Sequence, residues 1–232
     1  MSNPKNALVV RGGWPGHHPV ATTDAFIPFL ESQGFAVRVE ESSAIYADEA
    51  AMSDIDLIVQ CVSMATIERE EFDGLDAAVR RGVGLAGWHG GIVDSYRNTP
   101  EYPQLIGGYF ATHPPKPHHD RMGDGSDYMV PHRIEVTPAG KEHPITSGIG
   151  AFDLDTEQYW VLTDNYNTVL ATTTHASKPG DPWGSPVTCP AVWTRQWGKG
   201  RVFVATPGHD PDVLAMSPVR TMVERGLLWA SR

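Results

Sequence analysis

The 232-residue sequence has few features that cross-link a chain or anchor it in a membrane. Its only two cysteines, Cys61 and Cys189, lie far apart and lack C-x-x-C spacing, so neither a disulfide framework nor a zinc ribbon is indicated. No stretch approaches the about 18 uncharged apolar residues that a membrane-spanning helix needs, and Met1–Lys5 has no apolar core like that of a signal peptide. We therefore expect a cytoplasmic protein with no membrane partner and with two buried, unreactive cysteines.

Positive charge is also scarce. The chain has 18 Lys and Arg residues against 28 Asp and Glu residues, a formal net charge of −10, and no run of basic residues. Because affinity for nucleic acid comes mostly from clustered Lys and Arg side chains, this composition argues against a nucleic-acid partner. It also disfavours a strongly anionic substrate, unless a local pocket overrides the overall field.

What the sequence does have is an ordinary globular composition, with 41% hydrophobic residues. A chain of this length can bury a sizeable core without disulfides or metals to hold it together. We expect one domain spanning residues 1–232, because no linker and no internal repeat interrupts it.

Strand-like and helix-like patterns alternate over the first 90 residues. Short apolar runs that end in glycine or polar residues indicate buried strands, and apolar residues at helical spacing followed by glycine indicate helices. Parallel strands need crossover connections, so the alternation predicts an α/β fold: a doubly wound, mainly parallel sheet in three layers, with helices on both faces. The predicted strands are 7–10, 36–39, 55–59 and 83–88, with helices from about 26 to 34 and from 68 to 81.

The second half of the chain is less regular. Residues 97–127 are rich in proline, glycine, histidine and aromatics and predict a long irregular excursion. Further strands are expected at 133–137, 168–173, 187–194 and 201–205, and a closing helix at 213–229. In such sheets ligands bind beyond the carboxyl ends of the strands, so a site is expected in the loops after Val10, Val59, Trp88 and Ala205.

Several of the ten histidines fall in these loops. His17 follows the first strand, His89 the fourth, and His209 lies just past the last strand-like run, while His113 lies in the irregular segment. If the fold is as predicted, these imidazoles meet at one edge of the sheet, as the side chains of a catalytic or metal site must. The alternative for each is a turn residue or surface cap without chemistry.

The sharpest local motif is Gly87-Trp88-His89-Gly90-Gly91, directly after a predicted buried strand. It resembles a nucleophile elbow, in which flanking glycines allow a sharp turn that holds one side chain over the sheet edge. The central residue of an elbow is usually Ser or Cys, but here it is His89, which suits a base, an acid or a metal ligand better than a nucleophile. A tight turn without chemistry is the alternative.

Seven segments in order along nearly the whole chain resemble the ThuA-like, or trehalose-utilisation, family. They are residues 12–17, 84–91, 105–114, 143–146, 156–159, 190–193 with 198–203, and 208–209. The resemblance implies a class I glutamine amidotransferase-like, flavodoxin-like fold. It also implies a role in the catabolism of sugars, in a family linked to trehalose and to oxidised, 3-keto sugars.

The resemblance points to six patterned polar positions: His17, His89, His113, Glu157, Tyr159 and His209. The family often has an acidic residue after the first loop histidine, but this chain has His18, which leaves the role of that position open. The tract Lys116–Asp127 is individual to this chain, so substrate preference does not transfer, and the roles of His118 and His119 stay open.

We predict an enzyme of sugar or disaccharide metabolism that uses histidine acid–base chemistry, because an imidazole titrates near neutral pH. The expected catalytic residues are His89, Glu157 and His209. The expected ligands of one divalent metal, zinc by preference, are His17, His113 and His209. We expect no nucleotide cofactor.

Aromatic residues beside these motifs are candidates for binding a small-molecule sugar. An aromatic ring offers an apolar face, and Tyr and Trp add a polar tip. The candidates are Trp14, Trp88, Tyr109 and Tyr159, each of which could equally be a core or lid residue.

Two other functions remain open from the sequence. The first is a non-catalytic sugar-binding or regulatory protein that keeps the pocket without the chemistry. The second is an amidotransferase or cysteine hydrolase, which is disfavoured because the elbow residue is His89 and Cys61 lacks a glycine turn around it. A homodimer is the expected oligomeric state, since symmetric dimers are common for soluble proteins.

Overall fold

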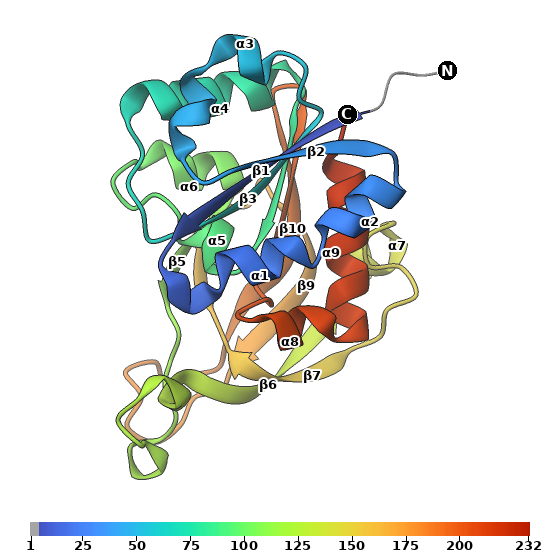
Figure 1. The fold of residues 1–232 in the computed structure, drawn as a ribbon. Coiled ribbons are helices and arrows are strands. Elements are labelled where there is room, and N and C mark those ends of the chain that lie inside the picture. The colour runs from blue at the N-terminus through green and yellow to red at the C-terminus, as the bar shows by residue number, and fades with distance from the viewer. Residues whose placement is uncertain (1–4) are drawn as a thin grey trace.

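The computed structural model describes residues 5–232, so the expectation that Met1–Lys5 carries no leader concerns residues that lie largely outside the described part. A nine-stranded sheet forms the centre of the molecule, with strand order β2-β1-β3-β4-β11-β10-β9-β6-β7 (Figure 1). Its strands are β1 (Lys5–Gly13), β2 (Phe35–Glu40), β3 (Leu57–Ser63), β4 (Gly84–Trp88), β6 (Met129–Val136), β7 (Phe152–Glu157), β9 (Thr168–His175), β10 (Val187–Trp197) and β11 (Gly200–Ala205).

The sheet has a parallel half and an antiparallel half. The strands β2, β1, β3, β4 and β11 pair in parallel, whereas β10, β9, β6 and β7 pair antiparallel with their neighbours. Seven of the nine strands nevertheless point the same way, because only β10 and β6 run in reverse. The predicted α/β fold with a large, mostly parallel sheet is therefore confirmed.

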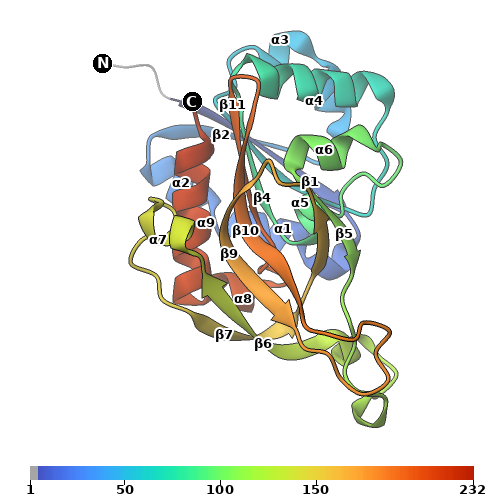
Figure 2. The same ribbon diagram turned by 180° about the vertical axis from the view of Figure 1, so that it is seen from behind.

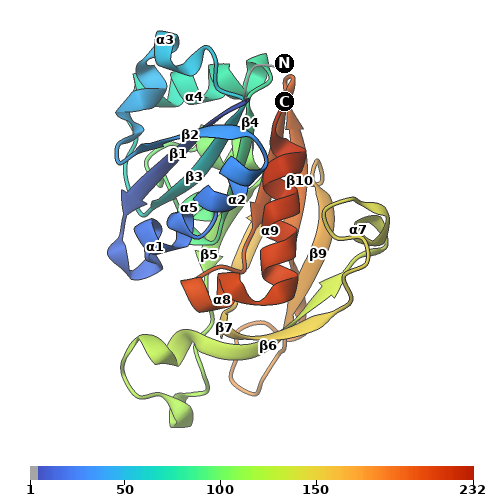
Figure 3. The same ribbon diagram turned by 45° about the vertical axis from the view of Figure 1, so that its right-hand side comes forward.

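Helices cover both faces of this sheet. In Figures 1 and 3, α1, α2, α8 and α9 lie on one face, and Figure 2 shows α4 and α6 on the other. The helices are α1 (Pro19–Asp24), α2 (Ile27–Ser32), α3 (Glu49–Met52), α4 (Arg69–Arg81), α5 (Gly90–Val93), α6 (Glu101–Ile106), α7 (Pro138–Glu142), α8 (Pro211–Ala215) and α9 (Ser217–Ala230). Within residues 5–232, no helix combines the length and apolar character needed to cross a bilayer.

The core divides into two hydrophobic clusters, one on each side of the sheet. Alternate residues of β3 show the division: Leu57 and Val59 belong to the cluster that α2 and α9 cover, and Ile58 and Val62 belong to the cluster that α4 and α6 cover. A strand buried on both faces reads as a continuous apolar run, which is why the sequence marked β3 clearly. The sheet is thereby fixed between two packed layers.

Two regions differ from the expected elements. Residues 97–127 are not irregular throughout, because they contain α6 and the strand β5 (Gly108–Thr112), which pairs with β8 (Trp160–Thr163) in a separate two-stranded sheet. The predicted closing helix is interrupted at Met216, where the chain turns extended before α9 begins with a proline in its first turn.

The residues between β5 and β6, 113–128, extend away from the sheet, and we call them the arm. It follows β5 and leads into β6, and Figures 1 and 2 show it beside the loop that joins β9 to β10. The arm contains two short 3₁₀ helices, His118–Asp120 and Gly125–Tyr128. It is the main departure of the chain from the compact sheet-and-helix body.

Candidate functional site

Three of the predicted histidines meet at the carboxyl edge of the parallel half. His17 lies in the loop after β1, His89 directly after β4, and His209 in the loop after β11. Together with Glu157 they offer ligand atoms that all lie within 4.8 Å of one another. We call these four residues the His/Glu cluster. The predicted convergence of imidazoles at this edge of the sheet is confirmed as geometry.

The His17 ring is placed by a short 3₁₀ helix, Pro15–His17, that turns the chain inward after β1. The ring is buried, and its Nδ1 lies 2.8 Å from the Ser63 hydroxyl at the end of the neighbouring strand β3. If the ring donates this hydrogen bond, its Nε2 keeps a lone pair that faces the cluster. His18 is exposed and its backbone carbonyl accepts from Thr22, so it contributes no ring to the cluster.

The His89 ring is oriented by the backbone of β11. His89 has a positive φ of 50°, which a non-glycine residue rarely adopts, and its own N–H donates to the Ala205 carbonyl at 2.7 Å. Its Nδ1 lies 2.8 Å from the Thr206 carbonyl. Because a carbonyl can only accept, Nδ1 carries the proton, and Nε2 of the neutral ring presents a lone pair to the cluster.

Glu157 enters the cluster from the other half of the sheet, at the end of β7. Its carboxylate is 7% exposed, and its Oε2 lies 3.0 Å from His89 Nε2, 3.3 Å from His209 Nδ1 and 3.9 Å from His17 Nε2. Its other oxygen, Oε1, lies 3.8 Å from His113 Nε2. Among residues 5–232, the ion-pair partners of this carboxylate are imidazoles, with no lysine or arginine among them.

Gly90 explains why the elbow motif carries glycine after its histidine. A Cβ at this position would overlap the His17 ring and would lie 3.1 Å from the Tyr159 hydroxyl. The Tyr159 hydroxyl is in turn 2.8 Å from His89 Nε2 and can donate to its lone pair. The absence of a side chain at Gly90 therefore allows three functional side chains to pack around one turn.

Burial sets the protonation of the cluster. Desolvation, followed by the neighbouring His89, lowers the pKa of His17 to about 3. Burial also lowers the pKa of His89, although the Glu157 carboxylate opposes that effect because it would accept a proton carried by Nε2. Burial alone would raise the pKa of Glu157, but the adjacent imidazoles of His209 and His89 outweigh it and hold this pKa well below its usual value. At neutral pH the site combines neutral imidazoles at positions 17 and 89 with an ionised carboxylate.

This protonation leaves two acceptors in contact. The lone pair of His89 Nε2 and the ionised Oε2 of Glu157 face each other at 3.0 Å, and a buried carboxylate without a balancing charge is costly. A divalent cation shared by these atoms would relieve both problems. Imidazole nitrogens and a carboxylate oxygen are ligands that zinc and other transition metals accept, so the residues present fit a metal.

His113, the third predicted metal ligand, lies beside this set rather than in it. Its ring is partly exposed, stacks against Phe110 at 5.3 Å between ring centroids, and meets only the outer oxygen of Glu157. The residues whose ligand atoms come together are those of the His/Glu cluster, which contains Glu157 and His89 but not His113. The roles assigned to all these residues stay predictions.

The four aromatic candidates occupy different environments. Trp14 is exposed and packs edge-on against His17, with ring centroids 4.7 Å apart, and Tyr159 is buried against His89. Tyr109 is exposed on β5. Trp88 is 1% exposed and packs on Phe26 in the core, so its indole has no open face for a sugar. Direct sugar binding by any of them stays a prediction, and the burial of Trp88 gives it a packing role.

Three groups that contact the site histidines were not predicted from the sequence. Ser63 and the Thr206 carbonyl orient two of the imidazoles, and both stand at strand ends, the one signal that could have found them. Tyr128, at the end of the arm, packs on His113 with ring centroids 4.4 Å apart. Nothing local in the sequence indicates that contact, because it depends on how the arm folds back.

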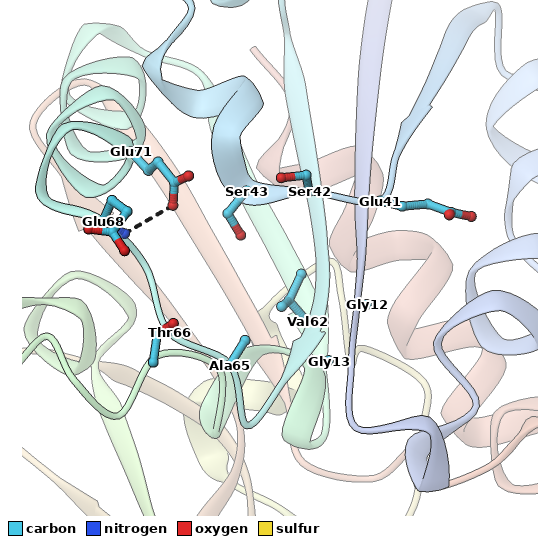
Figure 4. A pocket seen from close by; sticks show the side chains of 10 residues that line it. All are labelled: Gly12, Gly13, Glu41, Ser42, Ser43, Val62, Ala65, Thr66, Glu68 and Glu71. Carbon is cyan, nitrogen blue, oxygen red and sulfur yellow. Dashed lines mark hydrogen bonds between the residues drawn. The ribbon is translucent and has the colours of Figure 1, made fainter.

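A separate cavity of about 310 Å³ opens at the same edge of the sheet, between the ends of β1, β2 and β3. Its lining includes none of the four cluster residues and carries three carboxylates, those of Glu41, Glu68 and Glu71. Figure 4 shows that Glu41 extends away from the other two, and Glu71 accepts a hydrogen bond from the Glu68 backbone N–H as part of a helix cap. These carboxylates do not converge, so we assign no site there.

Cys61 is not placed for covalent chemistry. It is buried under the elbow, where a Cβ at Gly91 would lie 3.0 Å from its sulfur, and burial raises the pKa of its thiol to about 11. The thiol therefore stays protonated at neutral pH, which removes the activated nucleophile that a cysteine hydrolase needs. The expectation that Cys61 and Cys189 are buried free cysteines is confirmed.

Comparison with known proteins identifies the family. Residues 6–230 match the ThuA family, described as trehalose utilisation, and the chain belongs to this family. Similar solved structures include ThuA-like proteins from Bacteroides uniformis (TM-score 0.70, 16% identity, covering 99% of this chain and 93% of that one) and Parabacteroides merdae (0.72, 18%, 98% and 90%). A Salmonella typhimurium protein described as cytoplasmic is also similar (0.63, 14%, 98% and 100%). No curated protein matches the sequence.

Proposed function

We propose that this ThuA-family chain is a metal-dependent enzyme that acts on a sugar, of the disaccharide or 3-keto-sugar class, with the His/Glu cluster as its active site. The observation that carries the proposal is the convergence of three imidazoles and one carboxylate, whose ligand atoms all lie within 4.8 Å of one another. A shared cation would be held by these groups, and the family's description as trehalose utilisation supports the substrate class.

A bound divalent cation would polarise a sugar oxygen or lower the pKa of a bound water. The chain's own residues divide the remaining work. Ser63 and the Thr206 carbonyl hold the rings of His17 and His89 so that Nε2 of each neutral ring offers its lone pair to the cation. His209 is 12% exposed, the most accessible imidazole of the cluster, and is the group that exchanges a proton with the substrate.

Tyr159 supports this arrangement from within the protein. Its hydroxyl lies 2.8 Å from His89 Nε2, and burial raises its pKa well above the usual value, so it remains a neutral donor at any working pH. When a cation takes the lone pair of His89 Nε2, this hydroxyl would be free to donate a hydrogen bond to a sugar oxygen instead. Phe110, packed on Tyr159 with centroids 4.5 Å apart, helps to exclude water from this side.

The turn from β4 through His89 into α5 supports a further part of the proposal, that the fold is of the class I glutamine amidotransferase-like type. A strand that ends in one strained residue followed directly by a helix matches the elbow of the class I glutamine amidotransferase-like plan, with histidine in the nucleophile's place. A cytoplasmic location, given for the Salmonella protein in its own description, belongs to the proposal as well.

Elemental analysis tests the metal. Protein purified without a histidine tag should contain about one zinc or similar ion per chain, and His17→Ala should reduce that content below a tenth. His18→Ala is the matched control, because the adjacent ring is exposed and outside the cluster. No metal after metal-supplemented growth, or equal loss in both variants, would contradict the metal assignment.

Substrate turnover tests the enzyme. Wild-type protein is incubated with trehalose, other disaccharides and their 3-keto forms, and consumption is followed by chromatography. We expect one substrate to be consumed and His209→Asn to slow it by about 10² or more, the usual effect of losing an acid–base group. Sugar binding without consumption anywhere in the panel would instead favour the non-catalytic binding protein.

A further inference from the structure

Two exposed aromatic rings pack against histidines that lie near Glu157. Trp14 is 44% exposed and stands edge-on to His17, at 4.7 Å between centroids and 84° between ring planes. Tyr128 is 37% exposed and stands edge-on to His113, at 4.4 Å and 67°. The two supporting imidazoles face different oxygens of Glu157. Each ring is therefore separated from the same carboxylate by one imidazole, and part of its surface is open.

The Trp14 ring is held in place rather than free in solvent. Its backbone N–H donates to the Ser63 carbonyl at 2.9 Å, which ties the loop to the end of β3. The indole lies over Gly16, where a Cβ would overlap its six-membered ring. The contacts with Gly16 and His17 fix the orientation of the exposed part of the ring, so little conformational entropy is lost when a ligand covers it.

The Tyr128 ring is fixed by the internal bonds of the arm. The Asp127 carboxylate is buried and accepts the backbone N–H groups of Met122 at 2.6 Å and Gly123 at 2.9 Å. The Asp127 carbonyl accepts the N–H of Lys116 at 2.7 Å, which joins the two sides of the arm. Tyr128 follows this bonded residue directly, so the arm presents its ring at a defined position beside His113.

We propose that Trp14 and Tyr128 are the aromatic contacts of a saccharide-binding subsite over the His/Glu cluster, and that Tyr128 makes the arm a determinant of substrate preference. Aromatic rings beside convergent polar groups match a pyranose, which has an apolar C–H face and a polar hydroxyl rim. The inference rests on the proposed function for its substrate class. It assigns a binding role to Tyr128, which acts on affinity and not on the chemical step.

The competing explanation is that the two rings merely cover the imidazoles. A cover needs volume at that position, whereas a sugar contact needs an aromatic face. Substitutions at Tyr128 separate the two, because phenylalanine keeps the face and leucine keeps only the volume. Met122→Ala provides the matched control. Met122 is 78% exposed on the same arm, and its bond to Asp127 is made by its backbone N–H, which alanine keeps.

The experiment is calorimetric titration of the metal-loaded full chain with trehalose and with 3-keto-trehalose as probes, and for a probe that is consumed the KM from initial rates takes the place of the Kd. We expect Tyr128→Leu to raise the Kd of the bound probe about tenfold, Tyr128→Phe to change it by less than about threefold, and Met122→Ala to leave it unchanged. Trp14→Leu should weaken binding by a factor similar to that of Tyr128→Leu. Metal content and melting temperature, measured in parallel, should match the wild type in all four variants.

The outcomes separate this inference from the proposed function. If wild-type protein binds and consumes a sugar while Tyr128→Leu binds it with unchanged Kd, the subsite is wrong and the enzyme stands. If Tyr128→Leu weakens binding of a sugar that is never consumed, the subsite stands and the enzyme is wrong. Equal weakening by Tyr128→Leu and Tyr128→Phe overturns the stacking role, and a wild type that binds neither probe overturns both proposals.

Discussion

The two halves of the sheet contribute to the site in different ways. The parallel half supplies His17, His89 and His209 from loops at one edge, where the ends of neighbouring strands bring them together whatever the loops contain. The antiparallel half supplies Glu157 and, two residues later, Tyr159, whose positions depend on the register of β7 against β6. The first half thus fixes where a cation could bind, and the second supplies the negative charge that would retain it.

Removing the negative charge of Glu157 should have the largest effect on the site. Glu157→Gln keeps the shape of the side chain but leaves the imidazoles without an anionic partner. We expect bound metal to fall below a tenth of an ion per chain and turnover to fall by about 10³. Glu135→Gln, on the neighbouring strand β6 and paired with Arg133 at the surface, is the control and should retain both. Full metal content in Glu157→Gln would show that the antiparallel half is dispensable.

A smaller change at the turn after β4 should move an imidazole of the parallel half away from the carboxylate of the antiparallel half. In Gly90→Ala the added methyl group would push the His17 ring away from Glu157. We expect metal affinity to fall by about 10² by competition with a chelator, with the fold preserved in circular dichroism. Gly150→Ala, where a Cβ meets open space, should behave as the wild type. Normal affinity in Gly90→Ala would mean that the His17 ring is not a ligand.

Within the parallel half, the Ser63 hydroxyl lies 2.8 Å from His17 Nδ1 and orients the ring. Ser63→Ala removes the hydrogen-bond partner of Nδ1 and frees the ring to choose its tautomer, so we expect metal affinity to fall by about tenfold. Ser63→Thr, which keeps the hydroxyl, should restore most of it. The comparison is made with the same chelator competition, and equal affinities for the alanine and threonine variants would contradict a positioning role for the hydroxyl.

The mildest test compares histidines of the antiparallel half through the pH dependence of stability. Burial lowers the pKa of His175 on β9, and the neighbouring His132 lowers it further. Burial also lowers the pKa of His132 on β6, although the charge of Asp155 opposes that effect. Because the unfolded histidines protonate near pH 6.5 and the folded ones only below that, the unfolded state binds more protons as the pH falls. Unfolding free energy should therefore decrease below about pH 6.5, by at most about 1.4 kcal/mol per pH unit for each histidine.

Urea denaturation at pH 7.5 and pH 5.5 measures this difference, and His175→Asn should reduce it relative to the wild type. His119→Asn, an exposed histidine of the arm, serves as the control. A pH dependence that is the same in all three proteins would locate the proton uptake elsewhere.

How much of this follows from the sequence depends on the range of the interactions involved. The strand-to-loop transitions after β1, β4 and β11 are visible in local patterns, because strands buried on both faces are continuous apolar runs. Placing His17, His89 and His209 at one edge then needs only the rule that parallel strands end together. The fold class and three of the four cluster residues could be predicted on that basis.

The position of Glu157 could not be worked out in the same way. It was named from the family resemblance, and its proximity to the imidazoles requires β7 to pair with β6 and β6 with β9, contacts between residues far apart in the chain. Trp88 shows a related limit. Its place beside His89 suggested substrate contact, yet alternation along β4 turns the indole into the core, and a strand buried on both faces gives no sequence signal for which face is which.

The hydrogen bond from His89 to the Thr206 carbonyl has an evolutionary consequence. Many orienting partners of metal-binding histidines are side chains, which a single base change can delete. Here the acceptor belongs to the polypeptide itself, so any amino acid that tolerates the local conformation at position 206 preserves the imidazole's tautomer. Substitutions at position 206 should therefore leave the orientation of the His89 ring unchanged as long as the backbone keeps its conformation.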